Sequence, residues 1–446
     1  MRRILEWMES RTGIPGRVQL FLAKPCPPNI GWAHTLGSLL IVYLLLQGVT
    51  GVLLALYYSP SAEHAYESLA YVQEELFLGR FVLNLHIQGA GFVLLTAVLH
   101  LLRVLLTASY KKPREILWVS GICMLLLLTF FAFTGKLLPY DQRGYWATVV
   151  GLNLLEETPL LGPLLRDLLT GGTGALGSVT LARFYVLHVC VLPILLLALA
   201  GFHLRTLQVT GSAGPSTGAA GPPRPFFPWQ VFRDVVVSTL GCLVLFLVAW
   251  TLPVPESEPA SSSLGSYVPF PEWYFVPHYQ LLRMLPPDWQ FLGTTVLPGV
   301  LLAGLVVLPF VDRSPERRFR RRLPLNLVVL GGLLATVGLG IVGTVSHARR
   351  DDEGQGSVPA ETAVLDPVQR GAELFIEHAC DTCHTVGGQG NAFGPDLTLL
   401  ASRMREDAMG PILRNPGDYF PEATMPPFEG ADADLRCLVA YLRSLK

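Results

Sequence analysis

Long apolar runs separated by shorter polar segments fill the chain up to about residue 345. A helix needs about 20 residues to cross the hydrocarbon core of a bilayer. Seven runs are long enough, and they cover roughly residues 35–58, 81–106, 116–138, 184–207, 235–252, 291–310 and 325–345. The pattern therefore predicts seven transmembrane helices and an all-α membrane protein.

The first residues, MRRILEWMESRTGIPGR, show a different pattern. A removed signal peptide would have a short apolar core followed by small residues at a cleavage site, and this stretch has neither. We expect an amphipathic helix that lies along the membrane surface.

Composition agrees with a membrane protein. The 446 residues are 51% hydrophobic and only 15% charged, and the mean hydropathy is +0.43. The net charge of -1 gives no indication of nucleic-acid binding, and no nucleic-acid partner is expected. The seven cysteines are too few and too scattered for a disulfide framework, and only Cys380 and Cys383 have a spacing with chemical meaning.

Loop charges predict the orientation, because Lys and Arg are retained on the cytoplasmic side. The N-terminus and the loops at 111–114 and 312–322 are basic. The loop between the first two runs is acidic and carries Glu63, Glu67, Glu74 and Glu75. The N-terminus is therefore predicted in the cytoplasm, and the residues after 345 on the periplasmic side of a bacterial inner membrane.

The tail contains the stretch FIEHACDTCHTVGG, residues 375–388. Its Cys380, Cys383 and His384 form a C-x-x-C-H pattern, in which two thiols bond the edge of a c-type haem and the histidine ligates the iron. A zinc site would need more Cys or His than this tail has. The pattern predicts one covalently bound c-type haem.

Four histidines lie inside the apolar runs at a nearly constant interval. His86 and His100 are 14 residues apart, and His188 and His203 are 15 apart. Fourteen residues advance a helix by about 21 Å and nearly four whole turns, so both side chains share one face at two depths. A kink at Pro193 would realign the second pair. Intramembrane histidines also pack helices by hydrogen bonding, but two matched layers predict two non-covalent b-type haems, ligated by His86 with His188 and by His100 with His203.

Glycines repeat the same interval on the two neighbouring helices. Gly37 and Gly51 are 14 residues apart, as are Gly121 and Gly135. Glycine lets a flat macrocycle approach the backbone closely. These four residues are therefore predicted to flank the two haems.

Three arginines lie near the histidines in sequence, namely Arg80, Arg103 and Arg183. Each is placed where a haem propionate could reach it. Arginines that reach toward the membrane interface or set the topology would look the same.

At these residues the chain resembles the cytochrome b subunit of quinol:cytochrome c oxidoreductases, the cytochrome bc and bf complexes. The likeness covers most of residues 31–345. The 15-residue histidine interval and a second half of three helices are more similar to the bf type, here fused into one chain. The stretches that carry it are KKPREILW, YDQRGYWATVVGLN, LARFYVLH and PFPEWYFVPHYQLLR.

The resemblance implies that Pro271, Glu272, Trp273 and Tyr274 border the outer quinol-oxidation pocket. A carboxylate beside the outer haem can accept a quinol proton, so Glu272, with Tyr274, is the expected catalytic residue. The stretch TGKLLPY departs from the family, because it places Lys136 and Tyr140 where members usually have Tyr and Trp.

The tail is similar to class I monohaem cytochromes c in GPDLT (394–398) and TMPPF (424–428). This similarity implies that Met425 is the second axial ligand and that the Pro395 carbonyl orients His384. It also implies two terminal helices that meet near Gly371 and Tyr441.

Together these features predict three domains and a linker. Residues 1–210 form a four-helix di-haem cytochrome b domain, and residues 211–345 add three further transmembrane helices with the quinol-site loop. A linker at 346–361 leads to a small all-α cytochrome c domain at 362–446. The Gly- and Pro-rich stretch GSAGPSTGAAGPPRPFFP marks the first boundary.

The resemblance implies a subunit that oxidises quinol, passes one electron through the two b haems and delivers the other to the c-type haem, coupled to proton translocation. No Cys-x-His pattern of a Rieske centre occurs in the sequence, so a separate Rieske iron–sulfur subunit is an expected partner, with a downstream cytochrome or oxidase and a second copy of the chain in a homodimer.

Two alternatives stay open. One is a two-haem membrane cytochrome b that serves a dehydrogenase or hydrogenase. The other is a non-enzymatic anchor that tethers a cytochrome c carrier to the membrane.

Overall fold

The computed structural model describes residues 2–27, 30–156, 158–159, 161–172, 176–214, 222–254, 257–260, 270–286, 289–356, 367–378, 380–390, 394–420, 425–428 and 430–445. Two compact units are present. The membrane unit comprises the described residues within Met1–Ala260 and Pro269–Ser346, and the tail unit those within His347–Lys446.

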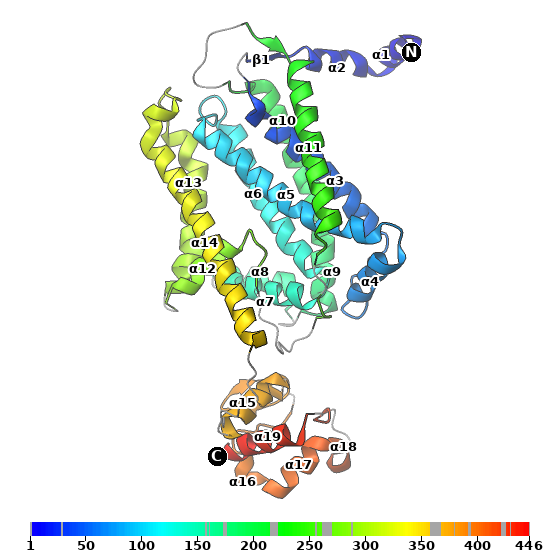
Figure 1. Ribbon diagram of the computed structural model, residues 1–446, viewed down its shortest axis with the longest axis vertical. Helices are drawn as coiled ribbons and strands as arrows, with labels where there is room; N and C mark the ends of the chain where they lie inside the picture. The colour runs from blue at the N-terminus through cyan, green and yellow to red at the C-terminus, as the bar shows by residue number, and fades with distance from the viewer. Residues whose placement is uncertain are drawn as a thin grey trace. The chain divides into compact units, whose positions relative to one another are not determined.

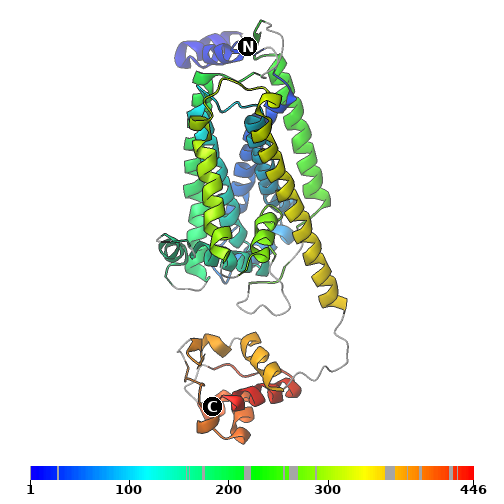
Figure 2. The same ribbon diagram turned by 90° about the vertical axis from the view of Figure 1, so that its left-hand side faces the viewer.

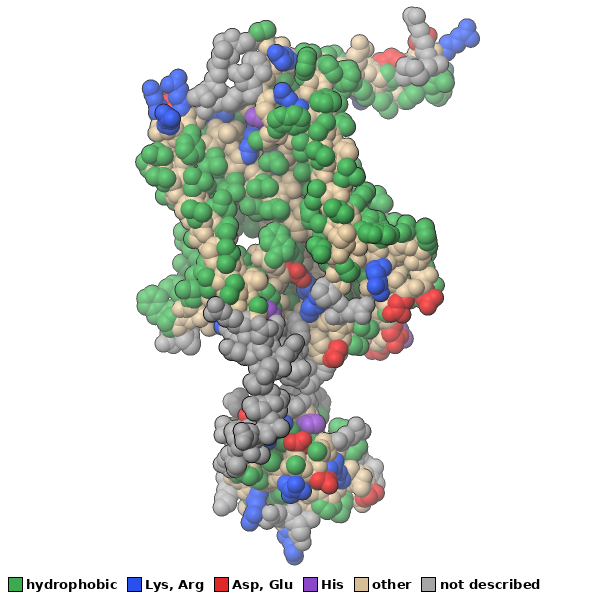
Figure 3. All heavy atoms as spheres, in the orientation of Figure 1, with side chains coloured by type: hydrophobic (Ala, Val, Ile, Leu, Met, Phe, Trp, Pro, Cys, Tyr) green, Lys and Arg blue, Asp and Glu red, His purple; other side chains and the backbone are tan. Residues whose placement is uncertain are grey.

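Seven helical spans in the described part of the chain are long and apolar enough to cross a membrane, as predicted. They are built from α3 (Leu36–Ala55), α5 (Gly79–Leu106), α6 (Glu115–Leu137), α9 with α10 (Ser178–Val186 and Leu192–Thr210), α11 (Trp229–Thr251), α13 (Leu297–Val311) and α14 (Leu323–Gly356). Figure 3 shows hydrophobic side chains over the flank of this unit. An apolar flank is what a bilayer would solvate.

Short helices cap the two ends of the membrane unit. At one end lie α1 (Arg2–Thr12) and α2 (Ile14–Leu22), so the predicted N-terminal helix is present as two segments. At the other end lie α4 (Ala65–Glu75), α7 (Gln142–Glu156), α8 (Gly162–Thr170) and α12 (Val276–Met284) (Figure 1 and Figure 2). A short antiparallel pair, β1 (Pro25–Cys26) with β2 (Arg224–Pro225), ties the segment after α2 to the segment before α11.

The fourth span contains a π-helical turn at Leu187–Val191, which includes His188. A π turn accommodates one extra residue in an α-helix. It therefore compensates for the 15-residue interval between His188 and His203. Pro193 follows this turn directly, inside the continuous span Ser178–Thr210.

The main apolar core lies where α3, α5, α6 and α11 meet. Its buried residues are Leu39, Tyr43, Leu85, Val93, Leu94, Ala97, Leu128, Leu245 and Ala249. Gly241 of α11 lies so close to this core that a Cβ there would be 2.8 Å from the Tyr43 hydroxyl. The first helix of the three-helix half thus packs directly on the four-helix half.

A polar cluster joins the α5–α6 connection to the α13–α14 connection. The carboxylate of Asp312 accepts hydrogen bonds from Tyr110 Oη at 2.6 Å, Lys111 Nζ at 2.7 Å and Arg322 Nη2 at 3.2 Å. The Lys111 and Arg322 side chains are only 7% and 6% exposed. Burial alone would raise the pKa of Asp312, but the hydrogen bonds from Lys111 and Tyr110 and the two positive charges lower it.

The tail unit is a small helical domain. Its elements are α15 (Pro367–Glu377), α16 (Leu400–Arg403), α17 (Glu406–Arg414), α18 (Pro416–Tyr419) and α19 (Asp432–Ser444), with a hairpin of β3 (Thr385–Val386) and β4 (Gln389–Gly390). Helices α15 and α19 cross at Gly371, where a Cβ would lie 2.6 Å from Tyr441 Cβ, as the resemblance implied.

Helix α14 continues to Gly356 and so includes the first part of the connection predicted at 346–361. Residues 357–361 of that connection lie outside the described residues.

Candidate functional site

Two pairs of histidines lie at two levels of the membrane unit. His86 of α5 faces His188 of the π turn, with ring centroids 6.2 Å apart and ring planes at 76°. At the other level, His100 of α5 lies near His203 of α10. The structure therefore brings together both pairs that the spacing predicts.

Each of the four glycines faces one of these rings. A Cβ built on Gly135 would lie 2.6 Å from Cε1 of His188, and one on Gly51 would lie 3.1 Å from Cε1 of His86. At the other level, Gly121 and Gly37 face His203 and His100 at 3.4 and 3.6 Å. The nearest groups to the glycines are thus the imidazoles themselves, so the glycines make room for the candidate ligands.

Hydroxyl groups hold three of the four imidazoles at Nδ1. The contacts are Thr50 Oγ1 to His86 at 2.9 Å, Thr134 Oγ1 to His188 at 3.1 Å and Ser120 Oγ to His203 at 2.9 Å. Sequence reasoning missed these partners. Nδ1 of His100 is buried and has no hydrogen-bond partner among the described residues.

The hydroxyl partners determine which ring nitrogen carries the proton. Each hydroxyl already donates to a carbonyl of its own helix: Thr50 to Leu46, Thr134 to Phe130 and Ser120 to Leu117. With that proton directed to the carbonyl, the hydroxyl oxygen accepts from the imidazole, which favours the tautomer with the proton on Nδ1. The same three rings also have backbone hydrogen-bond partners, namely Gln47 for His86, Phe131 for His188 and Leu117 for His203. Nε2 keeps a lone pair, which is the tautomer that a metal ligand needs.

These features fit a haem-binding role. The 6.2 Å between the ring centroids of His86 and His188 leaves room for one metal ion bonded to a nitrogen of each ring, since each such bond is about 2 Å long. The backbone of a glycine lies beside each ring. In three of the four rings, Nε2 keeps a lone pair that can bond a metal.

The three predicted arginines differ in their surroundings. Nε of Arg103 is buried without a hydrogen-bond partner among the described residues, which suits an acidic group of a ligand. Arg80 is exposed at the start of α5. Arg183 donates to the Leu168 carbonyl at 2.8 Å, near the end of α8.

The predicted quinol loop contacts the end of α6. Lys136 Nζ donates to Oε1 of Glu272 in an ion pair whose side chains are 21% and 35% exposed. The indole of Trp273 lies against Gly91 of α5, where a Cβ would be 3.1 Å from its Nε1. Tyr274 packs against the main core, and burial, with the charge of Glu272, raises its pKa. One of the two residues that depart from the family pattern, Lys136, is therefore the direct partner of the expected proton acceptor.

In the tail unit the C-x-x-C-H residues form a tight turn. The backbone N–H groups of Cys383 and His384 both donate to the Cys380 carbonyl, at 3.2 and 3.0 Å. Nδ1 of His384 bonds the Pro395 carbonyl at 2.9 Å, as the resemblance implied. A Cβ on Gly394 would lie 2.6 Å from Cε1 of His384. Nε2 of His384 is thereby the nitrogen available to a metal.

The other predicted ligand and the attachment thiol lie at the core of the tail unit. Met425 and Cys380 are partly buried and pack against the apolar cluster that contains Leu374 and Leu438. Burial raises the pKa of Cys380 to about 11.

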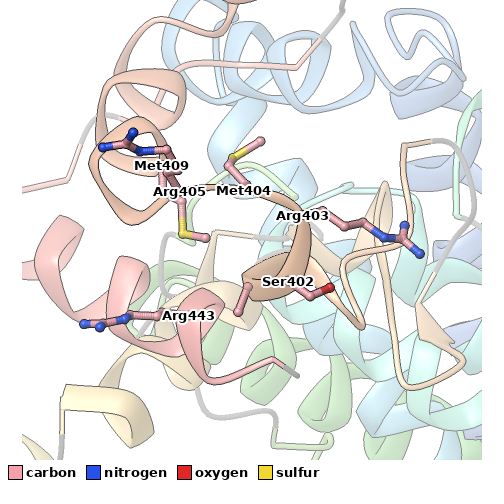
Figure 4. Close-up of a pocket in the computed structure, with 7 residues that line it drawn as sticks. Ser402, Arg403, Met404, Arg405, Met409 and Arg443 are labelled. Atoms are coloured by element: carbon pink, nitrogen blue, oxygen red, sulfur yellow. The ribbon is translucent and has the colours of Figure 1, made fainter.

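A shallow hollow of about 370 Å³ also lies in the tail unit, between Ala401, Ser402, Arg403, Met404, Arg405, Met409 and Arg443. Figure 4 shows the three guanidinium groups pointing away from its centre. None of the lining residues is a predicted haem ligand or attachment residue.

Comparisons with known proteins identify the class. The family described as "Cytochrome b/b6/petB" matches residues 21–211, "Cytochrome b(C-terminal)/b6/petD" matches residues 268–350, and "Cytochrome c" matches residues 368–446. The chain belongs to the cytochrome b family and carries a C-terminal cytochrome c domain. It is a multi-pass membrane protein of electron transport, and both of its families bind haem.

Individual relatives agree. Cytochrome b of Allochromatium vinosum is 32% identical over 346 residues, which span 72% of this chain and 83% of that protein. Cytochrome b of Mycena viridimarginata is 32% identical over 332 residues, or 73% of this chain and 84% of the relative. A chain of the solved structure "Hyperthermophilic respiratory Complex III" is similar with a TM-score of 0.67 and 28% identity, covering 76% of this chain and 91% of that one.

Proposed function

We propose that this chain is the quinol-oxidising subunit of a proton-translocating quinol:cytochrome c oxidoreductase of the bc type. One observation carries the proposal. Glu272 pairs with Lys136, and the adjacent residue, Gly135, faces the ring of His188. A proton acceptor therefore lies beside the histidine pair that would carry an electron.

The candidate ligands divide among three haems. His86 and His188 would hold an outer b-type haem, and His100 and His203 an inner one. In the tail, Cys380 and Cys383 would bond a c-type haem with His384 and Met425 as axial ligands. When bound, these groups supply one-electron chemistry.

The protein side chains supply the proton chemistry. Quinol oxidation releases protons together with electrons, and the carboxylate of Glu272 can accept a hydroxyl proton as a general base. Lys136 holds that carboxylate in place. Tyr274 is protonated at neutral pH, as an ordinary tyrosine with a pKa of about 10 also is, and burial raises its pKa further. Its hydroxyl can therefore donate a hydrogen bond to a quinol oxygen.

The spacing of the two levels supplies the energy conversion. Fourteen residues of α5 separate His86 from His100, an advance of about 21 Å along the helix. Moving one charge across the whole membrane potential stores about 2.3 kcal/mol per 100 mV. Electron transfer from the outer to the inner level moves charge across part of the membrane and therefore stores the corresponding part of this energy.

Location and partners complete the proposal. The loop charges support an N-terminus in the cytoplasm of a bacterium and a tail unit in the periplasm. The similarity to a Complex III chain supports assembly with a Rieske-type subunit, as a homodimer that delivers electrons to a downstream cytochrome or oxidase.

The test is quinol-dependent cytochrome c reduction by the complex isolated through a tag on this chain. Glu272→Gln should lower the rate by roughly 10²-fold with haem content unchanged, because a general base typically contributes that much or more. Glu67→Gln, at an exposed glutamate of α4, is the matched control and should keep the full rate. Equal rates for Glu272→Gln and the wild-type complex would contradict the proposal.

A further inference from the structure

Three of the four paired histidines have a hydroxyl acceptor for Nδ1, and the fourth, His100, has none among the described residues. The difference has a simple origin in the sequence. The hydroxyl belongs in each case to the residue just before a ring-facing glycine, in Thr50–Gly51, Ser120–Gly121 and Thr134–Gly135. At the fourth position the pair is Leu36–Gly37.

The equivalence of Leu36 with the hydroxyl residues rests on geometry. Gly37 approaches the ring of His100 as Gly51 approaches that of His86, with Cε1 as the nearest atom and Nδ1 next, at 4.0 and 3.7 Å from the built Cβ. The residue before each glycine is therefore on the same side of its ring. Leucine offers no acceptor there.

A hydrogen bond at Nδ1 changes what Nε2 can do. An acceptor on Nδ1–H fixes the ring orientation and makes the imidazole a more basic ligand. A more basic ligand stabilises the oxidised form of a bound iron, and hydrogen bonds to the axial ligands are one of the factors that set haem potentials. A ligand without this bond favours the reduced form by comparison.

We propose that Thr50, Thr134 and Ser120 are positioning residues for three axial histidines. Because Leu36 supplies no acceptor, His100 is the least basic iron ligand of the four. The outer level then has two strengthened ligands and the inner level one. This asymmetry favours electron transfer from the outer to the inner level. It rests on the proposed haem binding by these four histidines.

The experiment is an equilibrium redox titration of the b-type absorbance of the whole complex. Leu36→Thr supplies the missing acceptor and should lower the midpoint potential of one b-type haem, with the other b haem and the c haem unmoved. A tenfold change in the relative stability of the two oxidation states corresponds to about 59 mV. Leu40→Thr, one turn further along α3, is the matched control for loss of apolar volume and should shift nothing.

The reciprocal variant is Thr50→Val, which keeps the shape and removes the hydroxyl, while the Gln47 carbonyl stays as the other hydrogen-bond partner of His86. It should raise the midpoint of the other b haem. If Leu36→Thr loses its haem, Thr50→Val decides the question alone. Unmoved midpoints in variants that retain both b haems overturn the inference but leave the proposed function intact. Absence of b-type haem from the unmodified complex refutes the proposed function instead.

Discussion

Replacing a ring-facing glycine with alanine adds one methyl group beside an imidazole. The closer the glycine lies to its histidine, the larger the loss of b-type haem should be. The Cβ of Gly135→Ala would lie 2.6 Å from His188, whereas that of Gly37→Ala would lie 3.6 Å from His100. Optimal carbon–carbon contacts are about 3.5–4.0 Å. The first substitution is therefore about 1 Å too close, and the second fits.

The expected magnitude follows from overpacking. Forcing an extra methyl into a packed site typically costs about 1–3 kcal/mol, and every 1.4 kcal/mol weakens binding about tenfold. Without the contact, alanine would stabilise a helix interior by up to about 1 kcal/mol relative to glycine. Helix propensity favours alanine over glycine, so it cannot cause the loss of haem that we expect for Gly135→Ala.

The assay is the ratio of b-type to c-type absorbance in the purified complex, since the covalent haem serves as an internal standard. Gly135→Ala should lose the outer b haem and keep the inner one, Gly51→Ala should show a smaller loss, and Gly121→Ala and Gly37→Ala should retain both. Equal ratios for Gly135→Ala and Gly37→Ala, in proteins of equal thermal stability, would refute the steric reasoning.

Three further outcomes follow from the polar contacts. Asp312→Asn leaves the buried Lys111 and Arg322 without their carboxylate and should lower the stability of the membrane unit by about 3 kcal/mol, seen as a lower unfolding midpoint in detergent; an unchanged midpoint would count against the cluster. Because the pKa of Asp312 is lowered on folding, its stabilisation is complete above about pH 4 and fades as the pH falls further, so the unfolding midpoints of the wild-type protein and the Asp312→Asn variant should converge in acid. Lys136→Met should slow quinol oxidation at unchanged haem content and Lys136→Arg should retain it, whereas equal rates in both would show that the ion pair with Glu272 has no positioning role.

The sequence predicted the spans and the histidine levels because both depend on periodicity. The length of an apolar run can be read directly from the sequence. An interval of 14 residues returns a side chain to the same face of any helix. The local π turn at Leu187–Val191 could not be predicted, because Pro193 offered an equally good reason for realignment.

Contacts between distant segments cannot be predicted from sequence periodicity. Lys136 and Glu272 are 136 residues apart, and nothing in either neighbourhood specifies the other as its partner. From the sequence alone, Lys111 and Arg322 belong to basic loops that set the topology, whereas the structure pairs both with Asp312. The hydroxyl acceptors did leave a signal, because a Thr or Ser precedes three of the four spaced glycines.

The haem content of the purified complex tests the central claim most directly. Pyridine haemochrome analysis should find two b-type haems for each covalent c-type haem in this chain, and one b-type haem after His100→Leu. A complex without non-covalent haem, or a His100→Leu variant that still carries two b-type haems, would contradict the account.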